Sequence, residues 1–220
     1  MTAADLIPPH PTVRKLQEAA KECRACDLWK RATQTVFGEG KRTSTVMFIG
    51  EQPGNSEDLD GRPFVGPAGG LLDRALDEAG IDRSNVYVTN VVKHFKWEPR
   101  GKRRIHKKPN AAEIRACRPW LQAEIDVVKP RAIVCLGSTA AQAVIGPKFR
   151  VSTQRATFVD SPLAPLVTAT VHPSSILRAP TDAQRHEEMA RFVADLKTIK
   201  RAIERGRRGA TSAAGAARRA

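Results

Sequence analysis

The alternation of apolar and polar residues along the chain predicts buried strands that are separated by amphipathic helices. Four short runs are almost wholly apolar, which is typical of strands buried on both faces, and they cover residues 45–49, 86–90, 132–136 and 166–171. Helical spacing of apolar residues predicts helices over 12–31, 68–79, 110–127, 139–145 and 181–205. We therefore expect an α/β fold of three layers (αβα), in which a central, mainly parallel four-stranded sheet lies between helices.

Polar side chains stand where each predicted strand ends. Glu51 and Gln52 follow the first strand, and Asn90 ends the second. Ser138 follows the third strand and His172 follows the last. Because open α/β sheets bind their ligands beyond the carboxyl ends of the strands, this convergence predicts a binding site at that edge.

The segment 90–109 is unusually cationic: it contains eight Lys or Arg, one acid, two aromatic residues and two histidines. We interpret it as a long loop that is costly to hold near a folded core unless an anion neutralises it. A nucleic-acid strand suits it, because phosphates balance the cations and bases stack on the rings. His106 is the only group in its half of the loop that can be a neutral nucleophile or base near pH 7. The alternative is a solvated basic loop with an incidental histidine.

Length and charge set the broad class. The 220 residues suit one domain (1–205) followed by a basic tail (206–220) that we expect to be disordered, because it has no apolar periodicity. The net charge of +14 favours a polyanionic partner, above all nucleic acid. Neither a signal peptide nor a run long enough to cross a membrane is apparent, so we expect a cytoplasmic protein that makes no membrane contact.

The four cysteines indicate a metal centre. Cys23 and Cys26 form a C-x-x-C pair on the first predicted helix, Cys117 lies in a later helix and Cys135 in a strand. Thiolates gathered from distant elements can hold zinc or an iron–sulfur cluster, and spacing alone does not separate the two. Four unrelated buried thiols are the remaining alternative.

Several residues near the strand ends suit a nucleobase. Phe64 can stack on a base or simply anchor its loop, and Asn90 can read a pyrimidine edge or serve the turn. His172 can face a developing oxyanion, with Ser174 and Ser175 as phosphate contacts. The segment 176–178, which ends in Arg178, can wedge into a base stack.

Five motifs together resemble the uracil-DNA glycosylase superfamily. They are G-E-Q-P-G (50–54), G-R-P-F-V-G (61–66), T-N-V-V-K (89–93), H-P-S-S (172–175) and the cysteine pattern, which resembles the type-4, iron–sulfur branch. That branch usually has Ala at the position of Gln52. Gln52 and the K-R-R-I-H sequence that ends at His106 instead resemble the UdgX subgroup, whose members bind uracil in DNA and become covalently attached to it.

The resemblance implies a role for each matching residue. Glu51, His106 and His172 would be catalytic: Glu51 supports the cationic sugar, His172 stabilises the departing uracil and His106 captures the sugar C1′. Uracil, flipped out of preferably single-stranded DNA, would be bound by a monomer through Gln52, Phe64 and Asn90. The remaining DNA contacts would be Lys93, Lys102, Arg103, Arg104, Lys107, Ser174, Ser175 and Arg178. A structural 4Fe-4S cluster would be bound by Cys23, Cys26, Cys117 and Cys135.

These expectations describe a DNA-repair protein that joins itself to the abasic site, associated with the bacterial nucleoid while it is bound to DNA. Three alternatives stay open. The first is a hydrolytic, multiple-turnover glycosylase in which His106 only contacts phosphate. The second is a non-catalytic nucleic-acid-binding module with a zinc site. The third is an enzyme that acts on another damaged base such as hypoxanthine.

Overall fold

The computed structural model describes the backbone of residues 2–217 and the side chains of residues 2–206. Its centre is a parallel four-stranded sheet in the order β2-β1-β5-β6. The strands are β1 (Val46–Gly50), β2 (Val86–Asn90), β5 (Ala132–Leu136) and β6 (Leu166–Thr170). The predicted sheet is therefore confirmed, and its strand order reverses direction beside β1. In such sheets, that reversal opens a crevice at the carboxyl ends of the strands.

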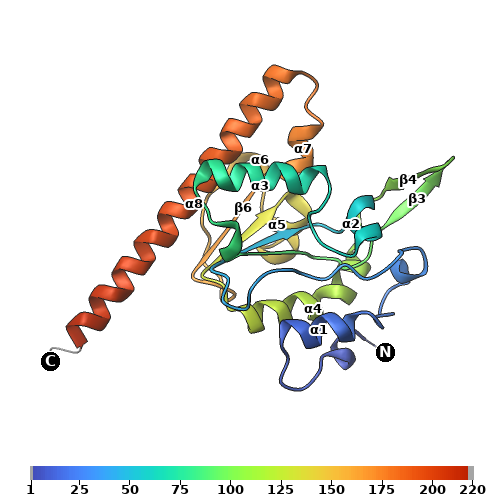
Figure 1. The fold of residues 1–220 in the computed structure, drawn as a ribbon, viewed down its shortest axis with the longest axis horizontal. Coiled ribbons are helices and arrows are strands. Elements are labelled where there is room, and N and C mark those ends of the chain that lie inside the picture. The colour runs from blue at the N-terminus through green and yellow to red at the C-terminus, as the bar shows by residue number, and fades with distance from the viewer. Residues whose placement is uncertain (1, 218–220) are drawn as a thin grey trace.

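Helices cover both faces of the sheet, so the three predicted layers are confirmed (Figure 1). One face packs against α3 (Pro67–Ala79) and α8 (Asp182–Ala217), through strand residues such as Phe48 and Val134. The opposite face packs against α1 (Val13–Ala20) and α4 (Ala111–Val128). Neighbouring strand residues face opposite layers because side chains alternate along a strand. The shorter helices are α2 (Asn55–Asp60), α5 (Ser138–Val144), α6 (Val151–Gln154) and α7 (Pro173–Leu177), with 3-10 turns at Ala4–Leu6, Asp27–Lys30 and Arg83–Asn85.

The cationic segment is a hairpin and not the predicted loop. Strands β3 (Trp97–Arg100) and β4 (Arg103–His106) pair antiparallel and project from the body of the molecule (Figure 1). Gly101, with φ +58°, supplies the backbone conformation that a two-residue hairpin turn requires. His106 lies opposite Trp97 in this ladder. Because side chains alternate, His106 and Arg104 share one face of the hairpin.

Two helix predictions need correction. The predicted helix over 12–31 ends at Ala20, and Cys23 and Cys26 lie in the turn that follows it. The Trp120 indole N–H donates to the Cys23 sulfur at 3.2 Å, a contact that ties this turn to α4. At the other end of the chain, α8 extends to Ala217, whereas the predicted helix ends at residue 205. Ala and Arg favour helix even without an apolar stripe, and the disorder of the tail stays a prediction. Residues 218–220 lie outside the described part, and the division of the chain at residue 205 stays a prediction. Within residues 2–217, no helix has the length and apolarity needed to cross a membrane.

Candidate active site

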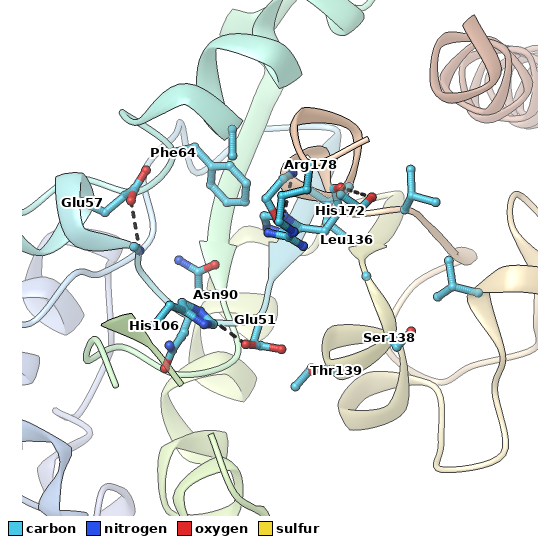
Figure 2. A pocket seen from close by; sticks show the side chains of 18 of the residues that line it. Glu51, Glu57, Phe64, Asn90, His106, Leu136, Ser138, Thr139, His172 and Arg178 are labelled. Carbon is cyan, nitrogen blue, oxygen red and sulfur yellow. Dashed lines mark hydrogen bonds and ion pairs between the residues drawn. The ribbon is translucent and has the colours of Figure 1, made fainter. Parts of the chain in front are cut away.

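A cavity of about 800 Å³ opens at the carboxyl ends of the strands. Figure 2 shows that it collects most of the predicted site residues from separate elements. Its lining includes Glu51, Gln52, Phe64, Asn90, His106, His172, Ser174, Ser175 and Arg178. The structure thus brings together residues that lie up to 127 positions apart, from Glu51 to Arg178 (178 − 51). The site lies where the strand order reverses, as expected for this class of sheet.

His106 and Glu51 face each other across this cavity. The His106 Nε2 atom lies 3.5 Å from the Glu51 Oε1 atom, and the imidazole is about half exposed (Figure 2). Burial lowers the pKa of His106 below its usual 6.5, opposed by the Glu51 carboxylate and aided by the positive charge of Arg178. The imidazole is therefore predominantly neutral at pH 7, the form in which it is a nucleophile. Burial and Arg178, and not the neighbouring hairpin cations, keep it so.

The hairpin that carries His106 is fastened to the body by Arg104. Its guanidinium donates to Asp58 Oδ2 at 2.6 Å and to Asn55 Oδ1 at 2.7 Å, both on α2. It also lies over the rings of Phe95 and Trp97. Asp58 is fully buried, so this ion pair is shielded from solvent. The described contacts of Arg104 are internal, and its contact with DNA stays a prediction.

Gln52 fixes the base of the same hairpin. Its Nε2 group donates to the carbonyls of Lys96 at 3.2 Å and Lys107 at 3.0 Å, and its Oε1 atom accepts from the Lys96 N–H. These bonds occupy both amide hydrogens, and the side chain is buried. Gln52 thus joins the residues that flank the two ends of the hairpin and helps to position His106, and its predicted contact with uracil stays a prediction.

His172 presents a single, defined hydrogen-bond donor. The Ser174 backbone N–H donates to the His172 Nδ1 atom at 3.1 Å, which makes that nitrogen the acceptor. Burial lowers the pKa of His172 to about 4, with smaller contributions from Arg178 and His106. The neutral ring must then carry its proton on Nε2. Such a donor suits a carbonyl oxygen on which negative charge develops.

Phe64 and Asn90 both line the cavity, and both side chains pack close to Gly50. Phe64 has φ +58°, a left-handed conformation that costs a non-glycine residue about 1–2 kcal/mol. Gly69 permits it, because a Cβ there would lie 1.7 Å from the Phe64 carbonyl oxygen. A Cβ at Gly50 would likewise meet the Asn90 Oδ1 atom at 2.3 Å. Among the described residues, the side-chain amide of Asn90 makes no hydrogen bond. Its donor and its acceptor are therefore both available to a ligand.

Glu57, which the sequence did not single out, holds the loop that carries Phe64. This buried carboxylate accepts from the Gly54 N–H at 3.0 Å and from the Gly66 N–H at 2.8 Å. It therefore joins the start of α2 to the end of the Phe64 turn (Figure 2). The bonds hold the strained backbone of Phe64 between two fixed points.

Replacing Glu57 with glutamine should weaken base stacking. A glutamine amide can accept only one of the two N–H bonds and opposes the other with its own N–H group. We expect a stability loss of about 1–3 kcal/mol and an increase of about tenfold in the dissociation constant for uracil-containing DNA, the ligand that the sequence resemblance implies, equivalent to ~1.4 kcal/mol. Glu78→Gln, an exposed change on α3, is the matched control. An unchanged dissociation constant in folded Glu57→Gln would contradict this role.

The structure separates the remaining predicted DNA contacts. Lys93 is buried and paired with Glu124 at 2.5 Å, so its predicted contact with DNA is wrong. Lys102 and Arg103 are exposed at the tip of the hairpin, and Lys107 pairs with Glu98 on its surface. Their contact with DNA stays a prediction.

The two serines that follow His172 have internal partners. The Ser174 hydroxyl lies 2.8 Å from His172 Nδ1, and the Ser175 hydroxyl donates to the His172 carbonyl at 2.7 Å. Both hydroxyls therefore help to hold the turn. Arg178 is exposed at the mouth of the cavity, where its charge acts on both imidazoles. Contacts of these three residues with phosphate stay predictions.

Three of the four cysteines lie near one another. Burial is the main reason that the pKa of Cys117 is raised to about 12; Lys93 opposes the rise, and the charges of Cys26 and Cys23 contribute to it. Burial also raises the pKa of Cys135. Among the described residues, no three His, Cys, Asp or Glu side chains are grouped closely enough to hold one metal ion. A four-iron cluster suits wider spacing, because each thiolate binds a different iron; the assignment of Cys135 to it stays a prediction.

The donor groups around these sulfurs fit such a cluster. The Trp120 indole N–H donates to Cys23, and the Lys93 backbone N–H donates to Cys117, each at 3.2 Å. Cys117 and Cys23 are buried among apolar side chains. Hydrogen bonds to sulfur and an apolar shell are the features by which proteins stabilise iron–sulfur centres.

Some of the supporting residues were not predicted although the sequence contains a signal for them. Glu124 lies four residues after Trp120 and one before Ile125, and an acid within an apolar helical stripe indicates a buried partner. The sequence R-G-K-R over 100–103 is a signal for a two-residue hairpin turn. Glu57 accepts from Gly54 three residues earlier, as in a capping box, but no local pattern marks its bond to Gly66 or the partners of Asp58, which lie far away in the sequence.

Fold and cavity together define an α/β protein whose site, between a stacking ring and a free amide, suits a planar polar ring. Residues 37–197 match the Uracil DNA glycosylase superfamily, and the chain belongs to that superfamily.

Within the superfamily, the chain is similar to type-4 uracil-DNA glycosylases. It is 39% identical over 179 residues to the one from Thermotoga maritima, a match that covers 81% of this chain and 87% of that protein. It is 44% identical over 133 residues to the one from Pyrobaculum aerophilum (60% and 64%). It is 42% identical over 127 residues to the one from Sulfurisphaera tokodaii (57% and 54%). The last two matches span less than two thirds of those relatives.

Proposed function

We propose that the protein is a uracil-DNA glycosylase that excises uracil from DNA, preferably single-stranded, and then joins His106 to the sugar C1′. The observation that carries the proposal is the position of a neutral imidazole 3.5 Å from Glu51, in one cavity with Phe64, Asn90 and His172. Single strands are favoured because a base outside a duplex is flipped at less cost. The exposed cations of the hairpin support contact with the phosphate backbone.

The residues divide the chemistry between the two sides of the scissile bond. Phe64 stacks on the flipped base and the Asn90 amide reads its edge. As the C1′–N1 bond breaks, its electron pair leaves with uracil, and the His172 Nε2–H stabilises the charge on the uracil carbonyl oxygen. The Glu51 carboxylate stabilises the cationic sugar on the other side.

Capture of the sugar then needs one lone pair. The unprotonated nitrogen of the His106 ring forms the new bond to C1′, and the resulting imidazolium loses its remaining N–H proton to solvent. A C–N bond of this kind has no easy hydrolytic exit, so the protein stays on the abasic site. The proposed subgroup is therefore UdgX, with single-turnover trapping as its consequence.

A denaturing gel tests the proposal directly. Incubation with a labelled uracil-containing oligonucleotide is expected to give a protein–DNA band that survives boiling, with one equivalent of free uracil released. Release of uracil over many turnovers, with a free abasic strand and no such band, would instead establish the second candidate, a hydrolytic type-4 enzyme. That candidate is favoured by the type-4 relatives and by Glu51, which can direct water as well as support the sugar.

We further propose that Cys23, Cys26 and Cys117, with Cys135 as the predicted fourth ligand, bind a 4Fe-4S cluster. When bound, the cluster cross-links the turn after α1 to α4 and supplies structure, not redox chemistry. Because the thiolates are brought together only in the folded chain, binding of the cluster would also contribute to the free energy of folding.

Replacing Cys117 with serine should remove the brown colour of the purified protein and its visible sulfur-to-iron absorbance. Iron content should fall, and thermal unfolding should begin at lower temperature because the cross-link is lost. Cys135→Ser is the companion variant: loss of absorbance would assign Cys135 as the fourth ligand, and retention would exclude it. Colourless wild-type protein that contains zinc would overturn the cluster.

A further inference from the structure

Lys93 and Glu124 form an ion pair that is almost completely buried. Their side chains are 1% and 0% exposed, and the Lys93 Nζ atom lies 2.5 Å from Glu124 Oε2. Lysine is rarely buried to this degree. A neutral pair of similar shape is often as stable as a buried ion pair, so stability alone does not account for its presence.

Every hydrogen of the Lys93 ammonium has an acceptor. Besides Glu124, it donates to the Thr89 hydroxyl and to the Asn90 carbonyl, each at 2.7 Å. Glu124 in turn accepts from the Tyr87 hydroxyl at 3.0 Å and from the Gly38 N–H at 3.1 Å. The pair is thus bonded to three of the five residues of β2, and two of these, Thr89 and Asn90, lie at its carboxyl end.

Asn90 is where this network meets the cavity. Its backbone carbonyl binds the buried ammonium, while its side chain lines the cavity. Gly50 packs against the same side-chain amide, since a Cβ at position 50 would lie 2.3 Å from the Asn90 Oδ1 atom. The ion pair therefore fixes the backbone of the residue whose amide is free to read a base.

The network also reaches the cysteines. The Lys93 backbone N–H donates to the Cys117 sulfur, and the Lys93 ammonium lies 5.2 Å from the centre of the Phe37 ring. Phe37 packs edge-on against Trp120, whose indole donates to Cys23. Two separate sets of contacts thus join the cysteine group to Lys93.

We propose that the Lys93–Glu124 pair is a positioning unit that holds the Asn90 side-chain amide where it can hydrogen-bond to the base. We also propose that the pair couples the position of this amide to the cysteine centre. This inference rests on the proposed function, since it assigns a supporting pair to the residue that reads uracil. Neither Lys93 nor Glu124 touches the substrate; both act through Asn90.

The test neutralises both charges at once, because removing one partner would leave the other charge buried and unpaired. In Lys93→Met/Glu124→Gln, we expect uracil release under single-turnover, saturating conditions to slow by about 10–100-fold, as for a misplacement of about 1 Å. Binding to undamaged DNA should be unchanged. The matched control, Arg83→Gln/Asp73→Asn, removes an exposed ion pair and should have no effect.

A double-mutant cycle with Asn90→Ala separates positioning from general destabilisation. If the pair acts through Asn90, neutralising it in the Asn90→Ala background slows the reaction no further. Full additivity of the two losses, or an unchanged rate in folded Lys93→Met/Glu124→Gln, would overturn the inference. If that variant does not fold, Tyr87→Phe, which removes one donor to Glu124 and no charge, should give a smaller loss that also vanishes in the Asn90→Ala background.

A second measurement is independent of activity. The side-chain amide signals of Asn90 in ¹⁵N NMR spectra, assigned by their disappearance in Asn90→Ala, should shift or broaden when the pair is neutralised and stay unchanged in the surface control. Unchanged signals would overturn the inference even if uracil release were affected. Shifted signals in a protein that releases no uracil would support the pair while refuting the proposed function.

Discussion

His106→Ala is expected to abolish the boiling-resistant protein–DNA band completely while uracil release stays measurable. Alanine removes the lone pair that forms the bond to C1′, and the space it leaves beside Glu51 admits water. The departing base is still stabilised by His172 and stacked on Phe64. A denaturing gel gives the adduct, and alkaline cleavage of the released strand counts the abasic sites.

The matched control is His186→Ala, which removes an exposed histidine of α8 that does not line the cavity. It should form the adduct like the parent protein. Persistence of the band in His106→Ala would show that another side chain captures the sugar. Mass spectrometry of digested wild-type adduct should find the added deoxyribose on the peptide that contains His106.

The pH profile of adduct formation gives an independent signature of the same imidazole. Only the neutral ring has a lone pair, so the rate is full above the pKa of His106 and falls as the pH decreases through it. Because burial lowers that pKa below 6.5, we expect a plateau at neutral pH and a fall only under more acidic conditions. Arg178→Gln removes a charge that lowers the pKa and should move the fall towards higher pH. A fall centred well above pH 6.5 in the parent protein would contradict the neutral imidazole.

The sheet was predictable because its signals are local. Runs such as 45–49 and 132–136 are apolar and short, and the alternation of strands with helices allows few topologies. The clustering of Glu51, Asn90 and His172 followed from that topology alone, since parallel strands end at one edge. The signals of the helix ends at Pro67, Gly80 and Asn110 were equally local.

What could not be predicted depends on contacts between distant segments. Lys93 reads in sequence as one more cation of a basic segment, and only the fold shows that it is paired with Glu124, 31 positions away. Gln52 looks like a base-reading amide, but in the fold it bonds to the backbone of Lys96 and Lys107, which flank the hairpin. In both cases a polar side chain next to the site supports the backbone.

His172→Ala should lower the single-turnover rate of uracil release by about 10²–10³-fold, the usual cost of one donor to a developing oxyanion. The His172 Nε2–H is well suited to this work, because the Ser174 N–H fixes the tautomer and a pKa of about 4 keeps the ring neutral throughout the pH range of the assay. Affinity for uracil-containing DNA should change little, since the charge on the carbonyl oxygen develops only as the bond breaks. Rapid-quench kinetics at saturating protein measure the rate, and titration with a non-cleavable analogue measures the affinity.

The same ring also caps α7, so the loss in rate must be separated from the loss of the cap. His172→Asn supplies a side-chain oxygen that can accept from Ser174, since asparagine is among the preferred capping residues, and alanine loses about 1 kcal/mol there. If the imidazole acts on the oxyanion, both variants are slow although only His172→Ala is less stable. If the ring served only the helix, His172→Asn would recover the parent rate, and the stabilising donor would have to be sought elsewhere in the cavity. The Ser174 hydroxyl bonds to His172, and the charge of Arg178 lowers the pKa of His172. Once His172 is replaced, Ser174→Ala should therefore slow uracil release no further.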